Sequence, residues 1–503
     1  MKSNKILVKI YCLILFITVL FSGYYKFYDD HLGLPKGCDE FGYLQLAEYV
    51  VEGNVFYNHN ETIFLYELRD FLKKDNIDYK NYSWLITPHC HHIDMLSGKK
   101  INQYPPATSI LLSIFNKEIR TTFFPIIVFI MLFIPVYLTL LYMNSPDTKI
   151  LFTFIVLSFL IVILSDKHPF GWHLRDVNSV AVTFGLILSA GFLLQKNPYL
   201  SIIILSFLVN FRLANFIIIP FLFFLIYNFR NNYIYNLWQL TKLSLISFLV
   251  GPFIYLNYVF ILTGSFFNTT YSSKDRTSIL NYDILRQNFN FYINFENSWF
   301  VLQFFSLLIL FIFYLSKIVN FKFFSVLILT STLNYVFFIN HKNTHEYYPY
   351  ASTVLVFGYL IYIMINKIQF KLKYLKISSL VFIFIFISSG FYYKFNLDKN
   401  NLNSFESEKI IYNNCFNDKS VVWSENSSGT VEYISNSLGF RLLWGNNESR
   451  LKVINWLIQN DHKQYFIIDD FKNSRLKVET FLNENDVNYK TKYCYGLGKI
   501  LEI

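Results

Sequence analysis

Two adjacent carboxylates, Asp39 and Glu40, follow the first hydrophobic segment of the chain, and a short helical pattern continues from them to Gly53. A carboxylate within hydrogen-bond reach of a hydroxyl can take its proton, so both residues are candidates for general-base chemistry. An acidic pair is also favourable at the start of a solvated helix, where it faces the positive end of the helix dipole. The dipeptide alone is consistent with both interpretations.

A second polar stretch, residues 165–176, separates two later apolar runs. The planar guanidinium of Arg175 suits a phosphate, because it can bind two oxygens at once. His173 and Asp176 are three residues apart, so they can share a helical face and bind a divalent ion such as Mg²⁺ or Mn²⁺. The alternative is a hydrated loop in which Trp172 anchors the chain at a membrane surface.

Arg212 is a second candidate for binding a phosphate, and it interrupts the apolar run from Leu200 to Tyr227. A charge at the centre of a bilayer costs at least about 2.5 kcal/mol. Two shorter helices that meet at residues 210–212 are therefore expected rather than one long helix. Such a break is tolerated where the backbone lines a cavity, which is where a lipid phosphate would lie. The alternative is that Arg212 snorkels to the interface.

The composition predicts an integral membrane protein. Of 503 residues, 53% are hydrophobic and only 16% are charged, whereas about a quarter are charged in soluble domains. The net charge of +10 comes mostly from residues between apolar runs and in the tail. Membrane orientation explains this charge, and no nucleic-acid partner is expected.

The expected fold is mainly α, a polytopic body over residues 1–393. Apolar runs of spanning length occur near 6–24, 122–142, 150–166, 178–195, 239–262, 299–316, 322–340, 350–366 and 376–393. With the pair inside Leu200–Tyr227, about eleven transmembrane helices are expected. This number keeps the basic connections on the cytoplasmic side and places the N-terminus there.

The same topology places the polar stretches on the outer face, including a long first loop, residues 25–121. Amphipathic patterns within it, at Tyr43–Val51 and Ile63–Leu72, are expected to lie along the membrane interface. The later loop, residues 263–298, is interpreted as a linker, with a mobile lid over the acceptor as the alternative. Residues 88–94 contain three histidines and are consistent with either a metal site or an ordinary polar loop.

The tail, residues 394–503, is expected to form a small extracytoplasmic α/β domain. Its strand-like runs are Ser420–Trp423, Tyr465–Ile468 and Lys499–Ile503, and its helix-like runs are Thr430–Leu438, Ser449–Gln459 and Ser474–Asn483. Cys38 and Cys90 share the first loop, and Cys415 and Cys494 share the tail. Each pair forms either a disulfide or two free thiols, because pairing cannot be read from sequence.

The frame around the first carboxylates, DExxYLxLAExxxxG directly after the first span, resembles the first-loop motif of the GT-C superfamily of membrane glycosyltransferases. This superfamily includes protein O-mannosyltransferases and the lipid A aminoarabinose transferase. The segment Gln103–Ile110, with Tyr104 followed by two prolines, is similar to the YPP segment that leads those enzymes into their next span. The resemblance covers residues 1–393.

The resemblance implies a polyprenyl-phosphate-linked sugar as donor and Asp39 as the catalytic base or a metal ligand, with Glu40 as its neighbour. The stretch 340–349 resembles the loop in which a charged residue before Tyr and Pro approaches the donor. Here Glu346 stands before Tyr347, where an arginine is often found. The positive charge for the phosphate would then come from nearby basic side chains, namely His341, Lys342 and His345.

These observations predict an inverting glycosyltransferase in a bacterial inner membrane, working on the outer face in the biosynthesis of cell-envelope glycan. Membrane lipids surround it, and its acceptor is a glycan, a lipid or a protein. A flippase for a lipid-linked sugar is one alternative, but it predicts internal repeats and charges near span centres. A glycan polymerase or ligase is another, whose main functional loop would follow a later span.

Overall fold

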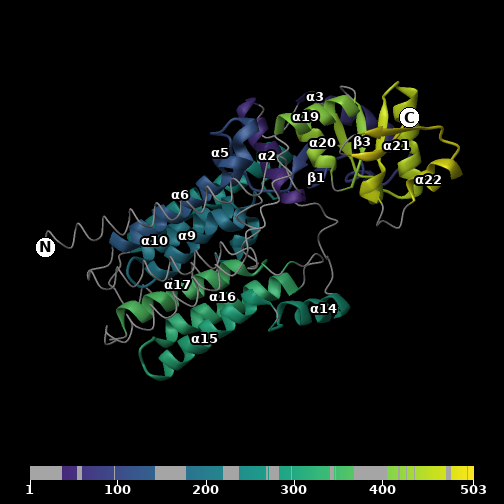
Figure 1. Cartoon of the computed structure of the whole chain (residues 1–503). Coiled ribbons are helices and arrows are strands. Elements are labelled where there is room, and N and C mark those ends of the chain that lie inside the picture. The colour runs from purple at the N-terminus through teal and green to yellow at the C-terminus, as the bar shows by residue number, and fades with distance from the viewer. Residues whose placement is uncertain are drawn as a thin grey trace.

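The computed structural model describes most of the chain, and it is mainly helical (Figure 1). The described residues are 37–53, 59–95, 97–141, 177–218, 237–267, 270, 282–295, 297–339, 345, 347–367, 405–416, 420–425, 427–435, 437–471, 477–494 and 497–503. In Figure 1 long apolar helices lie together on the left and below, the tail lies at the upper right, and α2 and β1 lie between them.

The long helices form what we call the apolar bundle. Its members are α6 (Arg120–Leu141), α9 (Ser179–Leu193), α10 (Pro198–Phe207), α12 (Leu237–Val250), α13 (Pro252–Thr263), α15 (Ser298–Leu315), α16 (Phe321–Ile339) and α17 (Tyr350–Asn366). Two helices of the described chain, Trp238–Thr263 and Phe321–Ile339, are long and apolar enough to cross a membrane. The expected runs at 6–24, 150–166 and 376–393 lie outside the described residues, so the number of spans stays a prediction.

Helices α9 and α17 pack closely against each other, with glycines at the points of contact. A Cβ added to Gly191 would overlap the carbonyl oxygen of Leu355, and one added to Gly358 would overlap that of Leu188. Glycine at such positions lets two backbones approach closely, and the resulting van der Waals contact is what holds helices together in an apolar surrounding. The two helices can therefore approach each other closely only because glycine occupies both positions.

The predicted break near Arg212 is confirmed. Helix α10 ends at Phe207, a short 3₁₀ turn covers Leu208–Asn210, and a second one runs from Leu213 to Ile218. The side-chain amide of Asn210 donates to the carbonyl oxygen of Val250 at 3.0 Å, and so satisfies a backbone group at the interruption of the neighbouring pair α12 and α13. The break leaves Arg212 half-buried at the end of a helix.

The first loop folds into short elements rather than lying along an interface. They are α2 (Gly37–Val51), α3 (His59–Lys74), α4 (Tyr79–Tyr82), the antiparallel strands β1 (His91–Ile93) and β2 (Lys100–Asn102), and α5 (Ala107–Leu112). The expectation for Tyr43–Val51 was wrong, because most of α2 is buried on every side. Helix α3 is amphipathic as predicted, but its apolar side packs on the tail instead of a membrane.

The tail contains a five-stranded sheet with the strand order β4-β3-β5-β7-β6. Its strands are β3 (Val421–Trp423), β4 (Leu438–Phe440), β5 (Gln464–Ile467), β6 (Lys490–Cys494) and β7 (Gly498–Glu502), and its helices are α19 (Phe405–Cys415), α20 (Ser428–Ile434), α21 (Asn447–Gln459) and α22 (Val478–Glu484). Strand β3 pairs in parallel with β4 and β5, whereas β7 pairs antiparallel with β5 and β6. All three predicted strands are confirmed; β4 and β6 were not foreseen.

One hydrophobic core joins the tail to the first loop. Leu65, Leu68 and Leu72 of α3 are buried in the same cluster as Val421 and Trp423 of β3. We call the combined region, α2 to β2 together with α19 to β7, the loop–tail unit. Its polar contacts also cross between the two segments, since Arg441 donates its backbone N–H to the carbonyl oxygen of Leu85 at 2.9 Å.

Both cysteine pairs form disulfides. Cys38 is disulfide-bonded to Cys90, and Cys415 is disulfide-bonded to Cys494.

The linker interpretation was wrong for part of residues 263–298, because Tyr282–Tyr292 forms the helix α14. Asn288 of α14 donates to the carbonyl oxygen of Ile339 at 2.8 Å, which fixes this helix against the end of α16.

Candidate active site

Asp39 lies in the first turn of α2, where its carboxylate accepts a hydrogen bond from the hydroxyl of Tyr104. Tyr104 lies two residues after the end of β2, and its ring stacks on Tyr43 of α2 with the ring centroids 4.7 Å apart. Its carbonyl oxygen accepts from the hydroxyl of Tyr258 on α13 at 2.8 Å. The tyrosine is therefore held by α2 and by the apolar bundle, and it presents its hydroxyl to Asp39.

Glu40, although next to Asp39, serves a different contact. Its side chain is only 4% exposed, and Oε1 accepts from the backbone N–H of Val177 at 3.3 Å. Val177 precedes Asn178, whose side chain caps the start of α9 by accepting from Val180 and Ala181. Glu40 thus ties α2 to the entrance of α9, while Asp39 faces Tyr104.

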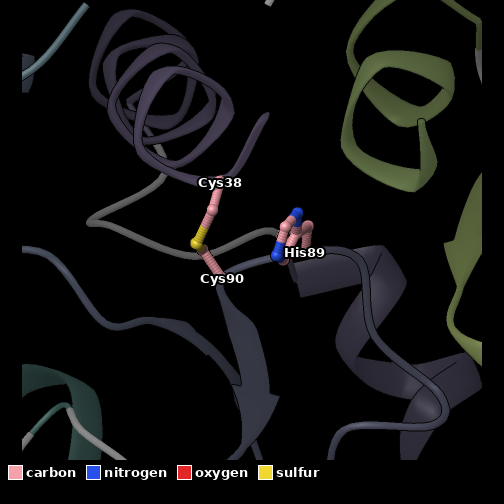
Figure 2. A group of neighbouring side chains, drawn as sticks. All are labelled: Cys38, His89 and Cys90. Atoms are coloured by element: carbon pink, nitrogen blue, oxygen red, sulfur yellow. A yellow bond between two sulfur atoms is a disulfide. The ribbon is translucent and has the colours of Figure 1, made fainter. Parts of the chain in front are cut away.

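The disulfide between Cys38 and Cys90 lies beside the same hydroxyl. Both sulfur atoms are 3.2 Å from the Tyr104 oxygen, and Nε2 of Gln103 is 3.2 Å from it. Figure 2 shows the bond joining the start of α2 to the segment before β1, with His89 next to it. The disulfide therefore helps to hold Asp39 beside Tyr104, because Asp39 follows Cys38 in the chain and the Tyr104 hydroxyl contacts both sulfur atoms.

Arg212 reaches the site from the broken helix. Its guanidinium carbon lies 5.1 Å from the ring centroids of both Tyr347 and Tyr348. The ring of His345 is 5.5 Å from that of Tyr347 and 5.1 Å from that of Tyr348. Two basic side chains from segments more than a hundred residues apart are thus gathered around one pair of tyrosines.

Tyr347 connects this basic group to Asp39. Burial raises the pKa of the Tyr347 hydroxyl well above its ordinary value, and the negative charge of Asp39 raises it further. Arg212 acts in the opposite direction on the pKa of Tyr347, through its charge and through a hydrogen bond to the tyrosine. A carboxylate and a guanidinium therefore act on the same phenol, which stays protonated at neutral pH.

The structure brings together five of the residues predicted from the sequence, namely Asp39, Tyr104, Arg212, His345 and Tyr347. Glu40 is close in sequence but turned to α9. The remaining candidates, His173, Arg175, Asp176, His341, Lys342 and Glu346, lie outside the described residues. Tyr348 was missed, although its place beside Tyr347 in an aromatic pair was a usable signal.

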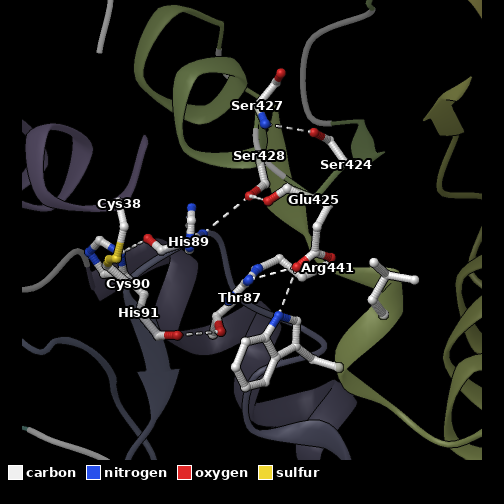
Figure 3. A network of polar contacts seen from close by, with 12 residues as sticks. Cys38, Thr87, His89, Cys90, His91, Ser424, Glu425, Ser427, Ser428 and Arg441 are labelled. Carbon is white, nitrogen blue, oxygen red and sulfur yellow. Dashed lines mark hydrogen bonds and ion pairs between the residues drawn. A yellow bond between two sulfur atoms is a disulfide. The ribbon is translucent and has the colours of Figure 1, made fainter. Parts of the chain in front are cut away.

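The histidine run in residues 88–94 is mostly structural. His91 is buried with Nδ1 3.1 Å from the carbonyl oxygen of His89, and His92 stacks on Trp84 with the ring centroids 5.3 Å apart. Burial lowers the pKa of His89 and of His92 to about 3, so both rings are neutral at pH 7. Figure 3 shows His89 facing Ser428 of the tail.

One group among the described side chains has the geometry for a shared metal ion: Cys38, His89 and Cys90, whose ligand atoms lie within 4.8 Å of one another. Thiolates are the metal-binding form of cysteine. Because the two cysteines are bonded to each other, they offer no thiolate to an ion. Asp39 is not in this group, so its predicted role as a metal ligand depends on His173 and Asp176.

Comparisons with known proteins add no assignment: no protein-family model matches the chain, and no curated protein is significantly similar to it.

Proposed function

We propose that this chain is an integral-membrane, inverting glycosyltransferase that moves a sugar from a polyprenyl phosphate to an acceptor hydroxyl. The observation that carries the proposal is the position of Tyr347, which lies 5.1 Å from the guanidinium carbon of Arg212 and whose pKa is raised by the charge of Asp39. Sugar transfer from a lipid phosphate needs a base for the acceptor and a positive charge for the departing phosphate. The site supplies both, from segments about 170 residues apart in the chain.

In this proposal Asp39 takes the proton of the acceptor hydroxyl as its oxygen attacks the anomeric carbon. The bond from that carbon to the phosphate oxygen breaks, and the phosphate leaves with the bonding electron pair. Arg212 and His345 stabilise the negative charge on the leaving phosphate through charge-assisted hydrogen bonds. A single displacement with one base inverts the anomeric centre, by analogy with inverting glycosidases.

Tyr104 and the disulfide would position the base. The Tyr104 hydroxyl donates to Asp39, so it fixes the orientation of the carboxylate. Tyr347 keeps its proton and can donate to either the carboxylate or the phosphate oxygens. A divalent ion at Asp39 belongs to the sequence-based hypothesis only, and no step here depends on one.

The proposed setting is a bacterial inner membrane, with the N-terminus in the cytoplasm and the loop–tail unit on the outer face. Two helices of spanning length and the shorter apolar helices around them support a membrane location. Both disulfides lie in the loop–tail unit, which fits an oxidising compartment outside the cytoplasm. The acceptor would be a glycan, a lipid or a protein of the cell envelope.

The test uses the full chain in nanodiscs, with undecaprenyl phosphate as the probe of the donor site. The wild type should bind this lipid, and Arg212→Ala should weaken the affinity about ten- to a hundredfold, since a hydrogen bond to a charged group contributes about 1.5–3 kcal/mol. Lys242→Ala on α12 is the matched control, because Lys242 is an exposed basic residue of the bundle. Equal affinity in the wild type and Arg212→Ala would contradict the phosphate assignment.

The base is tested by Asp39→Asn, which retains an acceptor for the Tyr104 hydroxyl. Transfer from an undecaprenyl-phosphate-linked sugar into the glycan, lipid or protein fraction of cell envelopes should fall about 10²- to 10⁴-fold, the usual contribution of a general base. Affinity for undecaprenyl phosphate should stay near that of the wild type. Full transfer in Asp39→Asn would remove Asp39 from the mechanism.

A further inference from the structure

We propose that the tail positions the catalytic carboxylate, with Gly429 and Glu432 of α20 as the positioning residues for Asp39. This inference rests on the proposed function for the role of Asp39, but its geometry stands independently. The tail would then be a permanent part of the active-site framework. Two separate routes of contact lead from α20 to Asp39.

The first route is direct packing of α20 on α2. Gly429 faces Phe41, which is fully buried two residues after Asp39. A Cβ added to Gly429 would lie 2.9 Å from the Cβ of Phe41 and closer still to the start of its ring. Because the Cβ of Phe41 is fixed to the backbone, rotation of the ring cannot relieve the whole clash, and the spacing between α20 and α2 would have to increase.

The second route runs through a buried ion pair. Glu432 Oε1 lies 2.6 Å from Nζ of Lys100 on β2, and both side chains are 3% exposed. The other carboxylate oxygen of Glu432 accepts from the backbone N–H of Gly439 at 3.2 Å. Glu432 is therefore fixed at both oxygens, and it holds the strand that leads to the active site.

Strand β2 connects this ion pair to Asp39, because Asn102 and Tyr104 follow Lys100 within four residues and contact α2. Asn102 donates its side-chain amide to the carbonyl oxygen of Gly42 on α2, and its Oδ1 accepts from the backbone N–H of Tyr104 at 2.9 Å. Tyr104 in turn donates to Asp39. A displacement of Lys100 would therefore reach Asp39 through Asn102 and Tyr104.

Further contacts show that the tail is seated on this part of the first loop. The hydroxyl oxygen of Ser428 accepts from the backbone N–H of His89 at 3.1 Å, next to the disulfide at Cys90 (Figure 3). At the other end of α20, the hydroxyl of Tyr433 donates to the carbonyl oxygen of Lys117 at 3.3 Å. Helix α20 is thus held at both ends against the segments that surround α2.

The experiment measures the environment of Asp39 directly, with Glu432→Gln as the main variant. Glutamine keeps the size of the side chain and an acceptor for Gly439, and it removes only the charge that pairs with Lys100. The full chain in nanodiscs is treated with a carbodiimide and glycinamide across a pH series, and labelling of the peptide with Asp39 is measured by mass spectrometry. We expect several-fold faster labelling and a shifted pH profile at Asp39.

Glu479→Gln is the matched control, because Glu479 forms an exposed ion pair with Lys499 in the same tail. It should leave the labelling of Asp39 unchanged. Gly429→Ala changes no charge and tests the other route; it should also increase labelling at Asp39. Unchanged labelling at Asp39 in both Glu432→Gln and Gly429→Ala would overturn the inference.

Transfer kinetics separate positioning from the proposed function. If Glu432 positions the base, Glu432→Gln should lower kcat while the affinity for undecaprenyl phosphate, which depends on Arg212, is retained. If the wild type binds no undecaprenyl phosphate but the variants still change the labelling of Asp39, the proposed function falls and the positioning role stands. A loss of lipid affinity equal to the loss of kcat would contradict the positioning role.

Discussion

The loop–tail unit and the apolar bundle both join segments that are distant in sequence, but they do so by opposite means. In the bundle, α9 and α17 meet at Gly191 and Gly358, where each backbone fills the space that a side chain would occupy. In the loop–tail unit, the first loop and the tail meet through particular polar pairs, such as Lys100 with Glu432. The contact between α9 and α17 leaves no room for additional atoms, whereas the buried ion pair needs a partner of opposite charge.

The difference follows from the surroundings of each region. Apolar helices in lipid gain little from burying more apolar surface, so close van der Waals contact decides their association. A buried charge, in contrast, is costly unless its partner is present. The residues of the candidate active site come from both regions, since Asp39 belongs to the loop–tail unit and Arg212 to the broken helix of the bundle. Each region should therefore respond to a different kind of change.

The largest effect is expected from Lys100→Ala, which leaves Glu432 buried without its charged partner. Removal of one member of a buried ion pair costs about 3–5 kcal/mol. The thermal unfolding of the loop–tail unit, followed by hydrogen exchange in β3 and α21, should occur at a clearly lower temperature. Lys452→Ala, which breaks an exposed pair with Asp75, should change it little. Equal effects of both variants would break the comparison.

A smaller effect is expected from Gly358→Ala, which adds one methyl group where α17 meets the backbone of Leu188. Overpacking of a close contact costs about 1–3 kcal/mol. Detergent extraction followed by a thermal scan of the bundle should show a lower Tm, while the loop–tail unit keeps its hydrogen-exchange protection. Val336→Leu is the control, because it adds similar volume at a side chain that is 57% exposed. A variant as stable as the wild type would show that α9 and α17 can separate.

The smallest effect is expected from lowering the pH by a single unit below 6.5, and it acts on the loop–tail unit through His92. Burial lowers the pKa of His92 to about 3 in the folded chain, whereas an unfolded histidine has a pKa of about 6.5. The unfolded state therefore binds the proton first, and stability falls as the pH drops from about 6.5 towards 3, by about 1.4 kcal/mol per pH unit for this group. His92→Asn should reduce the slope of Tm against pH.

The slope is the quantity to compare, because His92→Asn also removes the ring that stacks on Trp84. That loss shifts the unfolding temperature by a similar amount at every pH, so it does not change the pH dependence. A variant with the wild-type slope would show that His92 does not titrate as its burial requires.

Several features of the fold followed from local pattern alone. Apolar runs predicted the positions of the bundle helices, and Arg212 within an apolar run predicted the break after α10, because a charge disfavours an uninterrupted span. Three strands of the tail also followed from alternating and β-branched residues. Helix α14 and strands β4 and β6 were missed, because their packing partners lie elsewhere in the chain, as Ile339 does for Asn288 of α14.

The amino-acid sequence by itself determined the candidate groups of the site: Asp39 as a carboxylate after an apolar segment, and Tyr104 and Tyr347 through the resemblance of their segments to glycosyltransferase motifs. Only the tertiary structure decided that Asp39 faces Tyr104 while Glu40 faces Val177, and that the tail is packed against α2. These outcomes depend on contacts between residues tens to hundreds of positions apart. Local propensity carries no information about such contacts, because complementary packing and charge pairing arise only when the distant segments meet.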